Sequence, residues 1–312
     1  MDNYQETAAS DIPQGATENF KKRKIVILGS GFVGTATGKG FLSKGNEVAF
    51  IDVNPLVIEN LKNEKLKAGY ISDEIAKNGD LYMVNILTPT FNDHIDLRFI
   101  DSALISLGEV IIKHAVNYPV VVIRSTVPPG TTEKRFLPIL EKYSGKKAGT
   151  DFGICMNPEF LRQATAVEDF MQPKVIVIGS NDPKVGLLME ELYKPFGAPI
   201  YHLAIKEAEM LKYIHNLYNA SKISFFNEMR AISGAIGADA DKMFKIVMES
   251  AEASWNKQYG IKDMGPYNGS CLPKDTLAFL NWTNELLDRK MPLLHSIIQV
   301  NEHLKNKKYF GY

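Results

Sequence analysis

The sequence has few cysteines and no surplus of charge. It contains two cysteines, Cys155 and Cys271, in 312 residues, which is too few for a disulfide framework. Such usage is typical of a reducing compartment, so we expect a cytoplasmic location. Lysine and arginine together number 36, as do aspartate and glutamate. This balance argues against nucleic acid or an anionic membrane as a partner.

Long apolar runs are also missing. The longest have the length of a β-strand, so neither a signal peptide nor a transmembrane helix is predicted. Internal repeats and low-complexity segments are absent from the sequence. Residues 1–20 are polar and lack periodicity, and we predict that they form a disordered tail. The rest of the chain is long enough for two domains, each with its own core.

Short Val/Ile-rich segments alternate with helical ones over residues 21–204. They predict strands near residues 24–29, 47–52, 80–87, 120–125, 152–156, 174–179 and 200–203. Alternation of this kind predicts an α/β fold with a Rossmann-like, doubly wound parallel sheet. Ligands of such sheets bind at the carboxyl ends of the strands, so the segments that follow the strands carry most functional information.

The segment after the first strand carries a dinucleotide fingerprint, Gly29-Ser30-Gly31-Phe32-Val33-Gly34, which leads into a predicted helix. Its glycines allow a tight turn and close approach of a pyrophosphate at the helix N-terminus. Asp52 ends the next strand about twenty residues later, where it would accept a hydrogen bond from a ribose 2′-OH and repel a 2′-phosphate. The predicted cofactor is therefore NAD, bound by Gly29, Gly31, Phe32, Val33, Gly34 and Asp52.

A second motif, Asn268-Gly269-Ser270-Cys271-Leu272-Pro273-Lys274-Asp275, brings a thiol, an amine and a carboxylate together. Pro273 fits the first turn of a helix, where its missing N–H costs nothing. A thiol at that helix start would lie at the positive end of the dipole and beside Lys274, and both effects favour the thiolate. Cys271 is thus a candidate nucleophile. Taken alone, however, a single cysteine is more often a buried structural residue, here next to an ordinary surface ion pair. Cys155, in its apolar run, is assigned to the core.

From about residue 205 the apolar pattern becomes helical, with no proline and no glycine before Gly234. The recurring apolar residues are Met210, Ile214, Leu217, Phe225, Met229, Ile232 and Ile236. A helix of this length would span about 45 Å at 1.5 Å per residue, and its apolar face must be covered. We predict that it is the spine of an all-helical domain over residues 205–312, shared with a second subunit in a homodimer. Further helices are predicted at 239–250, 272–289 and 292–308.

Polar groups also follow two other strands and recur on the long helix. One polar loop covers residues 125–132, and the next begins at Asn157. Lys212 and Asn216 are four residues apart on one helix face, with Glu209 three residues before the lysine. Each feature has an ordinary structural interpretation, namely turn chemistry for the loops and a surface ion pair for Glu209 and Lys212.

Together these motifs resemble the UDP-glucose/GDP-mannose dehydrogenase family. The matching segments, in family order, are residues 29–34, Thr88-Pro89, 125–131, 157–162, Lys212 with Asn216, 222–228 and 269–275. The resemblance implies oxidation of the C6 alcohol of a nucleotide sugar of the UDP-glucose type to the uronic acid, with two NAD consumed per turnover. It also implies a role in polysaccharide biosynthesis.

The resemblance further implies roles for individual residues. Cys271 would capture the aldehyde as a thiohemiacetal, and oxidation of that adduct would give a thioester for hydrolysis. Lys212 and Asn216 would stabilise oxyanions. Asp275, Thr126 and Glu159 would position or activate water and relay protons. The other implied cofactor contacts are Thr88, Pro89, Ser125, Thr126 and, as a secondary candidate, Lys274. No metal is implied.

Departures from the family pattern leave the substrate open. The family's third, C-terminal domain, which grips the nucleotide, has no counterpart up to Tyr312, and Trp255-Asn256-Lys257 replaces an Arg-Ile-Gly segment. Asn268-Gly269 replaces paired glycines, and Gln163-Ala164 replaces Glu-Gly. Two alternatives therefore stand beside the main prediction. One is a two-electron dehydrogenase of the β-hydroxyacid or 6-phosphogluconate type, which needs no cysteine, and the other is a truncated NAD-binding dimer without turnover.

Overall fold

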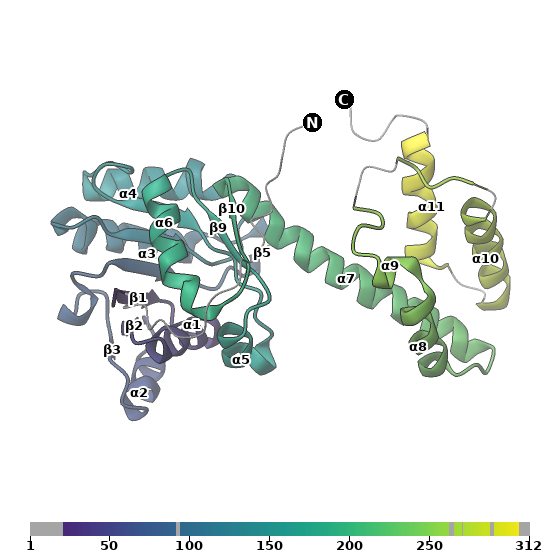
Figure 1. Ribbon diagram of the computed structural model, residues 1–312, viewed down its shortest axis with the longest axis horizontal. Coiled ribbons are helices and arrows are strands. Elements are labelled where there is room, and N and C mark those ends of the chain that lie inside the picture. The colour runs from purple at the N-terminus through teal and green to yellow at the C-terminus, as the bar shows by residue number, and fades with distance from the viewer. Residues whose placement is uncertain (1–20, 92–93, 262–264, 270, 288–289, 306–312) are drawn as a thin grey trace, which may run out of the picture. The chain divides into compact units, whose positions relative to one another are not determined.

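The computed structural model describes residues 21–91, 94–261, 265–269, 271–287 and 290–305 (Figure 1). The chain forms two compact units that meet between Ile214 and His215, within helix α7 (Ile205–Ala235). The tail predicted for residues 1–20 lies outside the described residues. No helix in the described part of the chain is both long enough and apolar enough to span a membrane.

The first unit is built on an eight-stranded sheet with the strand order β10-β9-β8-β7-β4-β1-β2-β3. The strands are β1 (Lys24–Leu28), β2 (Glu47–Ile51), β3 (Ala68–Gly69), β4 (Leu81–Val84), β7 (Val120–Ile123), β8 (Gly153–Met156), β9 (Ile176–Gly179) and β10 (Ile200–Leu203). All pairs from β3 to β8 are parallel, which confirms the predicted α/β class. The order of the strands reverses at β1, and ligand sites of doubly wound sheets lie at such a switch point.

The two strands at the β10 edge run in the other direction. β9 and β10 are parallel to each other, but β9 meets β8 in the antiparallel sense, with Met156 opposite Gly179. A parallel neighbour would require a crossover that returns the chain along the strand. The α-helix between β8 and β9 is α5 (Ala166–Met171), whose 6 residues span only about 9 Å. The sheet is therefore mostly parallel rather than parallel throughout.

Helices cover both faces of the sheet, because successive side chains of a strand point to opposite faces. From β1, Ile25 and Ile27 pack with α1 (Phe32–Ser43), α2 (Pro55–Asn63), α5 and α6 (Pro183–Tyr193). Val26 and Leu28 pack on the other face with α3 (Arg98–Val110) and α4 (Leu137–Ser144). Burying an aliphatic side chain of this size contributes about 1.5–3 kcal/mol to stability, so the two layers hold the strand ends firmly.

Shorter elements complete the first unit. β5 (Thr90–Phe91) and β6 (His94–Ile95) form a separate antiparallel pair. Single helical turns lie at Glu74–Ala76, Ile112–His114, Gln163–Thr165 and Lys194–Phe196, and a π-helical segment covers Thr132–Phe136. Asn54 and Asp182 cap α2 and α6 by accepting from backbone N–H groups, each before a proline at the first helical position.

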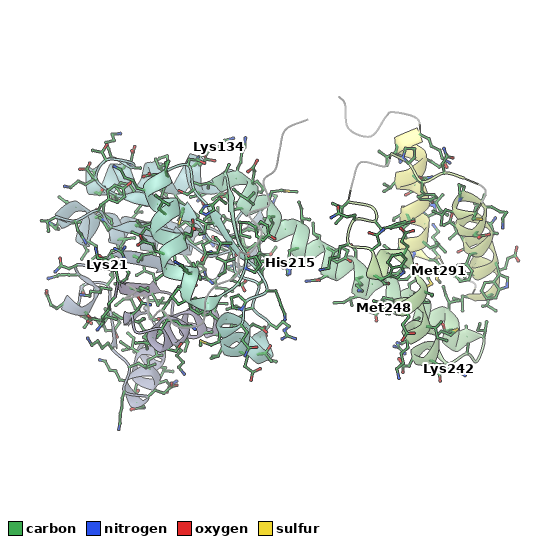
Figure 2. All side chains as sticks on the ribbon, in the orientation of Figure 1. Lys21, Lys134, His215, Lys242, Met248 and Met291 are labelled. Carbon is green, nitrogen blue, oxygen red and sulfur yellow. The ribbon has the colours of Figure 1, made fainter. Side chains whose placement is uncertain are left out.

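The second unit is helical, as predicted. Besides the remainder of α7 it contains α8 (Ala240–Ser250), α9 (Glu252–Trp255), α10 (Leu272–Leu287) and α11 (Pro292–Lys305). The ends predicted for the last two helices, beyond residues 287 and 305, lie outside the described residues. The core is small and centres on Ile232, Leu280, Met291 and Leu294. Figure 2 shows the described side chains and labels Met291.

Candidate active site

The glycine turn after β1 has the backbone shape that a pyrophosphate requires. Gly29 has a φ of 81°, and a side chain there would collide with the backbone of Asn85. A Cβ on Gly34 would overlap the carbonyl oxygen of Gly29, so α1 reaches the turn only because that residue is glycine. At Gly31, by contrast, no atom beyond its chain neighbours lies within 4 Å of the position that a Cβ would take. The space over Gly31 is thus left open for a ligand.

The N-terminus of α1 adds hydrogen-bond donors to that space. Gly31 is the N-cap, none of the described side chains caps the helix, and its first turn contains no acidic residue. First-turn N–H groups have no partner inside a helix, and together with the helix dipole they favour an anion. Phe32 and Val33, two of the predicted cofactor contacts, belong to this turn, and the ring of Phe32 is exposed.

Asp52 follows β2 and fastens the glycine turn. Its Oδ2 accepts from the Ser30 N–H at 2.8 Å, and its Oδ1 accepts from the Asn54 N–H at 2.9 Å. A carboxylate has about four acceptor sites, so capacity remains for a ribose hydroxyl. The structure therefore places Asp52 beside the turn, as expected, and adds a second task that the sequence pattern did not reveal.

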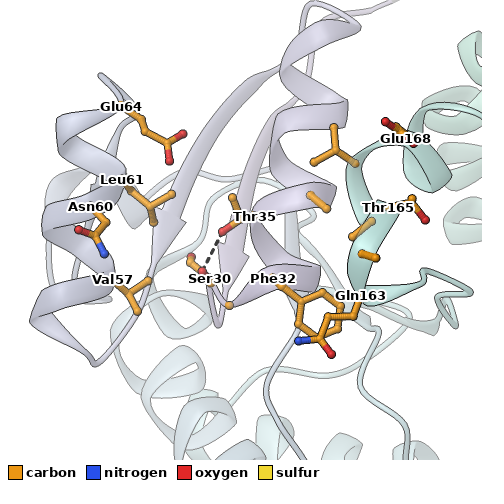
Figure 3. A pocket seen from close by; sticks show the side chains of 15 residues that line it. Ser30, Phe32, Thr35, Val57, Asn60, Leu61, Glu64, Gln163, Thr165 and Glu168 are labelled. Carbon is orange, nitrogen blue, oxygen red and sulfur yellow. Dashed lines mark hydrogen bonds between the residues drawn. The ribbon is translucent and has the colours of Figure 1, made fainter.

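An open cavity of about 520 Å³ adjoins the glycine turn (Figure 3). Its walls are α1, α2 and residues 163–168, and Figure 3 shows Gln163 next to the ring of Phe32. Asp52 is not part of the lining, but Ser30, whose N–H it accepts, is. Gln163 and Ala164, where the chain departs from the family pattern, therefore lie beside the predicted cofactor turn.

The loops after β4 and β7 are joined to each other. The Thr88 hydroxyl donates to the Thr126 carbonyl oxygen at 3.0 Å, and the buried Ser125 hydroxyl donates to the Ile86 carbonyl oxygen at 2.7 Å. Pro89 follows Thr88 in the same loop. The predicted residues Thr88, Ser125 and Thr126 thus form one connected rim at the carboxyl ends of neighbouring strands.

Lys212, in the second turn of α7, forms a buried ion pair with Glu159. The side chains are only 6% and 15% exposed, and Lys212 Nζ lies 2.9 Å from Glu159 Oε1. The same ammonium donates to the carbonyl oxygen of Glu159 and lies over the ring of Phe160. The structure thus brings together two residues that the sequence placed in separate motifs.

The surface ion pair considered for Glu209 and Lys212 is wrong. Glu209 has no exposed surface, and it accepts hydrogen bonds from the backbone N–H groups of Gly130 and Thr132, the latter at 2.8 Å. Lys212 instead pairs with Glu159. The spacing of three residues was consistent with a pair on one helix face, but it did not reveal that this face is buried.

A buried network around Arg124 was also missed. Its guanidinium donates to Asn85 Oδ1 at 3.2 Å, to the Tyr193 hydroxyl at 2.8 Å and to Asn157 Oδ1. Asn157 in turn donates to the Val177 carbonyl oxygen at 2.7 Å. Burial raises the pKa of the Tyr193 phenol, so that it stays neutral. The network joins the residues that follow β4, β7 and β8 to a backbone carbonyl within β9. The only sequence signal for it was an arginine that ends an apolar run.

In the second unit, Cys271 lies directly before α10, and Pro273 is in the first turn of that helix, as predicted. The cysteine is exposed, and the Asp275 N–H donates to its carbonyl oxygen at 2.8 Å. Lys274 and Asp275 form an ion pair in which the side chains are 71% and 64% exposed. The neighbouring Ser270 lies outside the described residues. Asn216, on α7, has its Oδ1 3.1 Å from Nδ1 of His215.

The other cysteine, Cys155, is buried on β8, as expected for a core residue, and burial raises the pKa of its thiol. Neither cysteine forms a disulfide. Within the described residues, no group of three or more His, Cys, Asp or Glu side chains could hold a metal ion.

Comparison with known proteins agrees with the motifs. The NAD binding domain of the UDP-glucose/GDP-mannose dehydrogenase family matches residues 23–197, and the central domain of that family matches residues 206–303. The two matches cover both units, and the first includes the glycine turn.

Individual relatives show the same pattern. The chain is 34% identical to a GDP-mannose 6-dehydrogenase of Pseudomonas putida, over 89% of this chain and 68% of the relative. It is 32% identical to the UDP-glucose 6-dehydrogenase TuaD of Bacillus subtilis, over 90% of this chain and 63% of the relative. The chain thus spans about two thirds of the length of these relatives.

Among solved structures, a ternary complex of GDP-mannose dehydrogenase from Pseudomonas aeruginosa superposes with a TM-score of 0.85 at 31% identity. That match covers 91% of this chain and 69% of the other. A UDP-glucose dehydrogenase from Pyrobaculum islandicum, also 31% identical, gives a TM-score of 0.69 and covers 94% of this chain and 70% of the other.

Proposed function

Because the chain belongs to the UDP-glucose/GDP-mannose dehydrogenase family, we propose that it is an NAD-dependent nucleotide-sugar 6-dehydrogenase. The C6 alcohol of a nucleotide sugar would become a carboxylate in two successive oxidations. Each oxidation would transfer one hydride to a bound NAD, so two NAD would be consumed for each sugar. The observation that carries the four-electron form is Cys271, whose exposed thiol lies directly before α10, since a two-electron dehydrogenase needs no thiol.

Lys212 and Glu159 would act in the first oxidation. The buried ammonium of Lys212 is weakly screened, and it would stabilise an oxyanion at the substrate C6 oxygen. Glu159 holds that ammonium through its carboxylate and its carbonyl oxygen. We assign Thr126 and Glu159 to water positioning and proton relay. Thr88, Pro89, Ser125 and Lys274 are proposed as cofactor contacts beyond the glycine turn.

Cys271 would carry the aldehyde to the acid. Its thiolate adds to the aldehyde carbon, so that a C–S bond forms and the carbonyl oxygen becomes an oxyanion. Departure of a second hydride gives a thioester. Water then adds to the thioester, and the C–S bond breaks to release the carboxylate and regenerate the thiolate. Asn216 would donate to the oxyanion, and Asp275 would position or activate the water.

We also propose a homodimer formed through α7. In the second unit Leu217, Ile223 and, on α8, Ile246 are exposed although they are large and apolar. Large apolar side chains that stay exposed are typical of protein interfaces. A two-fold dimer would bring the same helix face from both copies together.

The test is the NADH yield per sugar, measured with a panel that starts with GDP-mannose and UDP-glucose. The wild type should form two NADH per sugar, and Cys271→Ala should stall before the second oxidation. Cys271→Ser should form an adduct but hydrolyse it poorly, because an alkoxide is a worse leaving group than a thiolate. A yield of one NADH from the wild type would favour the two-electron alternative. Bound NAD with no turnover of any sugar would favour an NAD-binding dimer.

A further inference from the structure

Glu209 is a buried carboxylate that no step of the proposed reaction uses. It lies one turn before Lys212 on α7 and is 0% exposed. Its Oε1 accepts from the Thr132 N–H at 2.8 Å, and its Oε2 accepts from the Gly130 N–H. Gly130 lies in the loop that begins at Ser125, and Thr132 is where that loop enters the π-helical segment. Burying a charged group costs folding free energy unless the group is hydrogen-bonded. The two hydrogen bonds from Gly130 and Thr132 are therefore what allows the Glu209 carboxylate to be buried.

We infer that Glu209 is a positioning residue, which anchors the loop of residues 125–132 to the helix that carries Lys212. This inference rests on the proposed function for its catalytic consequence, but the anchoring itself can be tested without turnover. Lys212 links α7 to Glu159 in the loop after β8. Glu209 links the preceding turn of α7 to the loop after β7. The two buried charges thus fasten two different loops to one helix.

The anchor extends to the cofactor side of the site. Thr126 accepts from the Thr88 hydroxyl through its carbonyl oxygen, so the loop after β4 is bonded to the loop that Glu209 holds. The Ser125 hydroxyl donates to the carbonyl oxygen of Ile86 in the same way. The anchor therefore also holds Thr126 in position relative to Lys212. We assign Thr126 to proton relay and Lys212 to oxyanion stabilisation.

The local geometry requires a carboxylate in particular. Gly130 has a φ of 87°, a conformation that favours glycine. In this turn the N–H groups of Gly130 and Thr132 both point to the Glu209 carboxylate. Each N–H takes one carboxylate oxygen. A glutamine of the same shape has one acceptor oxygen and one NH₂ donor, so one buried N–H would lose its acceptor. Such a loss costs more than the hydrogen bond itself contributes.

The first experiment compares Glu209→Gln with a matched control, Glu207→Gln. Glu207 is exposed on the same turn of α7, and it accepts from the backbone N–H of Ala204 rather than from another loop. Hydrogen exchange is followed over residues 126–132, where Pro128 and Pro129 contribute no amide. We expect faster exchange there in Glu209→Gln and no change in the control, with residues 24–34 unchanged in both. Unchanged exchange over 126–132 in Glu209→Gln would overturn the inference.

Kinetics provide the second readout. In Glu209→Gln we expect kcat to fall by about 100-fold, because misplacement by about 1 Å can cost that much. The dissociation constant of NAD should rise by less than about tenfold, since only the proposed cofactor contacts in or bonded to this loop are loosened, while the glycine turn and Asp52 keep theirs. A merely structural residue would affect NAD binding and turnover together through loss of folded protein. If the wild type oxidises no nucleotide sugar, the proposed function fails, whereas the exchange comparison still decides whether Glu209 anchors the loop.

Glu209→Asp covers the case in which Glu209→Gln does not fold. Aspartate keeps the charge but is one methylene shorter, so it can reach only one of the two amides. We expect exchange over residues 126–132 and kcat to lie between those of wild type and Glu209→Gln. If Glu209→Asp matched the wild type in both, charge alone would suffice, and the proposed two-point anchor would be wrong.

Discussion

The two units use the same pair of chemical groups, an ammonium beside a carboxylate, in opposite settings. In the first unit the side chains of Lys212 and Glu159 are almost fully enclosed, whereas in the second unit those of Lys274 and Asp275 are mostly exposed. A buried pair has its position set by packing and by its other hydrogen bonds. An exposed pair is screened by water and contributes little. The first unit therefore presents a charge that packing holds in place, whereas the second presents an exposed cysteine beside an exposed ion pair.

The two units also differ in how much apolar surface they bury. The sheet of the first unit buries two extensive layers of aliphatic and aromatic side chains, one on each face. In the described part of the second unit, four buried apolar residues form the centre of a small core, and large apolar side chains of α7 and α8 are exposed. The first unit thus has an extensive core of its own, while the exposed apolar side chains of the second are what the proposed dimer would cover.

The largest expected effect comes from Lys212→Met compared with Lys274→Met. Loss of the buried ammonium should lower kcat by about 100- to 1,000-fold, because an oxyanion-stabilising group acts in a weakly screened site. Loss of the exposed ammonium of Lys274 should change kcat by less than about tenfold, as for other exposed ion pairs. Steady-state turnover of the preferred nucleotide sugar measures both variants.

Lys212→Met also leaves the Glu159 carboxylate without its cation, which costs stability. Thermal unfolding in the presence of NAD must therefore show that the variant is folded before its rate is compared. Equal losses of kcat in the two folded variants would show that burial of the Lys212–Glu159 pair gives it no greater catalytic importance than the exposed Lys274–Asp275 pair.

The next largest effect concerns the proposed dimer interface of the second unit. Ile223 on α7 is 62% exposed, and Ile223→Asp would place a charge in the proposed dimer interface. We expect the dimer dissociation constant to rise by at least about 100-fold, since an unpaired charge in an apolar interface is costly. Sedimentation velocity measures the change. Val116→Asp, at an exposed position of the first unit, is the control and should leave the assembly unchanged. A wild type that is monomeric at all concentrations would refute the dimer.

The strands and the glycine turn could be predicted because local sequence determines them. Continuous Val/Ile runs are required wherever a sheet is covered on both faces, and Gly29 and Gly34 are required by backbone geometry at their own positions. Cys271 before a helix follows from Pro273 in the same way. Each of these features depends on residues that are close along the chain.

The links made by Glu209 and Arg124 could not be predicted, because their partners are distant in sequence. Glu209 bonds to residues 77 and 79 positions earlier, and Arg124 bonds to Tyr193, 69 positions later. The spacing of apolar residues along a helix or strand does not show whether a charged side chain on it is buried with distant partners or exposed to solvent. The direction of β9 escaped prediction for a similar reason, because it depends on the path of a crossover rather than on the strand itself.

A smaller effect tests the double task of Asp52. Asp52→Asn should weaken NAD binding by about tenfold, because the amide NH₂ cannot accept from the Ser30 or Asn54 N–H that it would face. NADP should be weakened less, since the repelling charge disappears as well. Isothermal titration with both cofactors measures the two constants. Asp182→Asn, which alters a helix cap elsewhere in the first unit, is the control. Equal weakening of NAD and NADP would mean that Asp52 only fastens the turn.

The smallest effect concerns the core of the first unit at high pH. The Tyr82 hydroxyl accepts from the Gly79 N–H at 2.9 Å and donates to the Ala76 carbonyl oxygen at 3.0 Å, and burial raises the pKa of Tyr82 to about 12. A tyrosine in the unfolded chain ionises near pH 10. The contribution of the buried Tyr82 hydroxyl to the free energy of unfolding is therefore complete below about pH 10 and is lost as the pH rises to about 12. Tyr82→Phe should cost about 1–2 kcal/mol at pH 7, because the Gly79 N–H loses its acceptor. Above pH 10 the difference between variant and wild type should shrink, since phenylalanine has no proton to lose. Urea unfolding at pH 7, 10 and 11.5 measures this trend, and a difference that stays constant would show that Tyr82 does not limit alkaline stability.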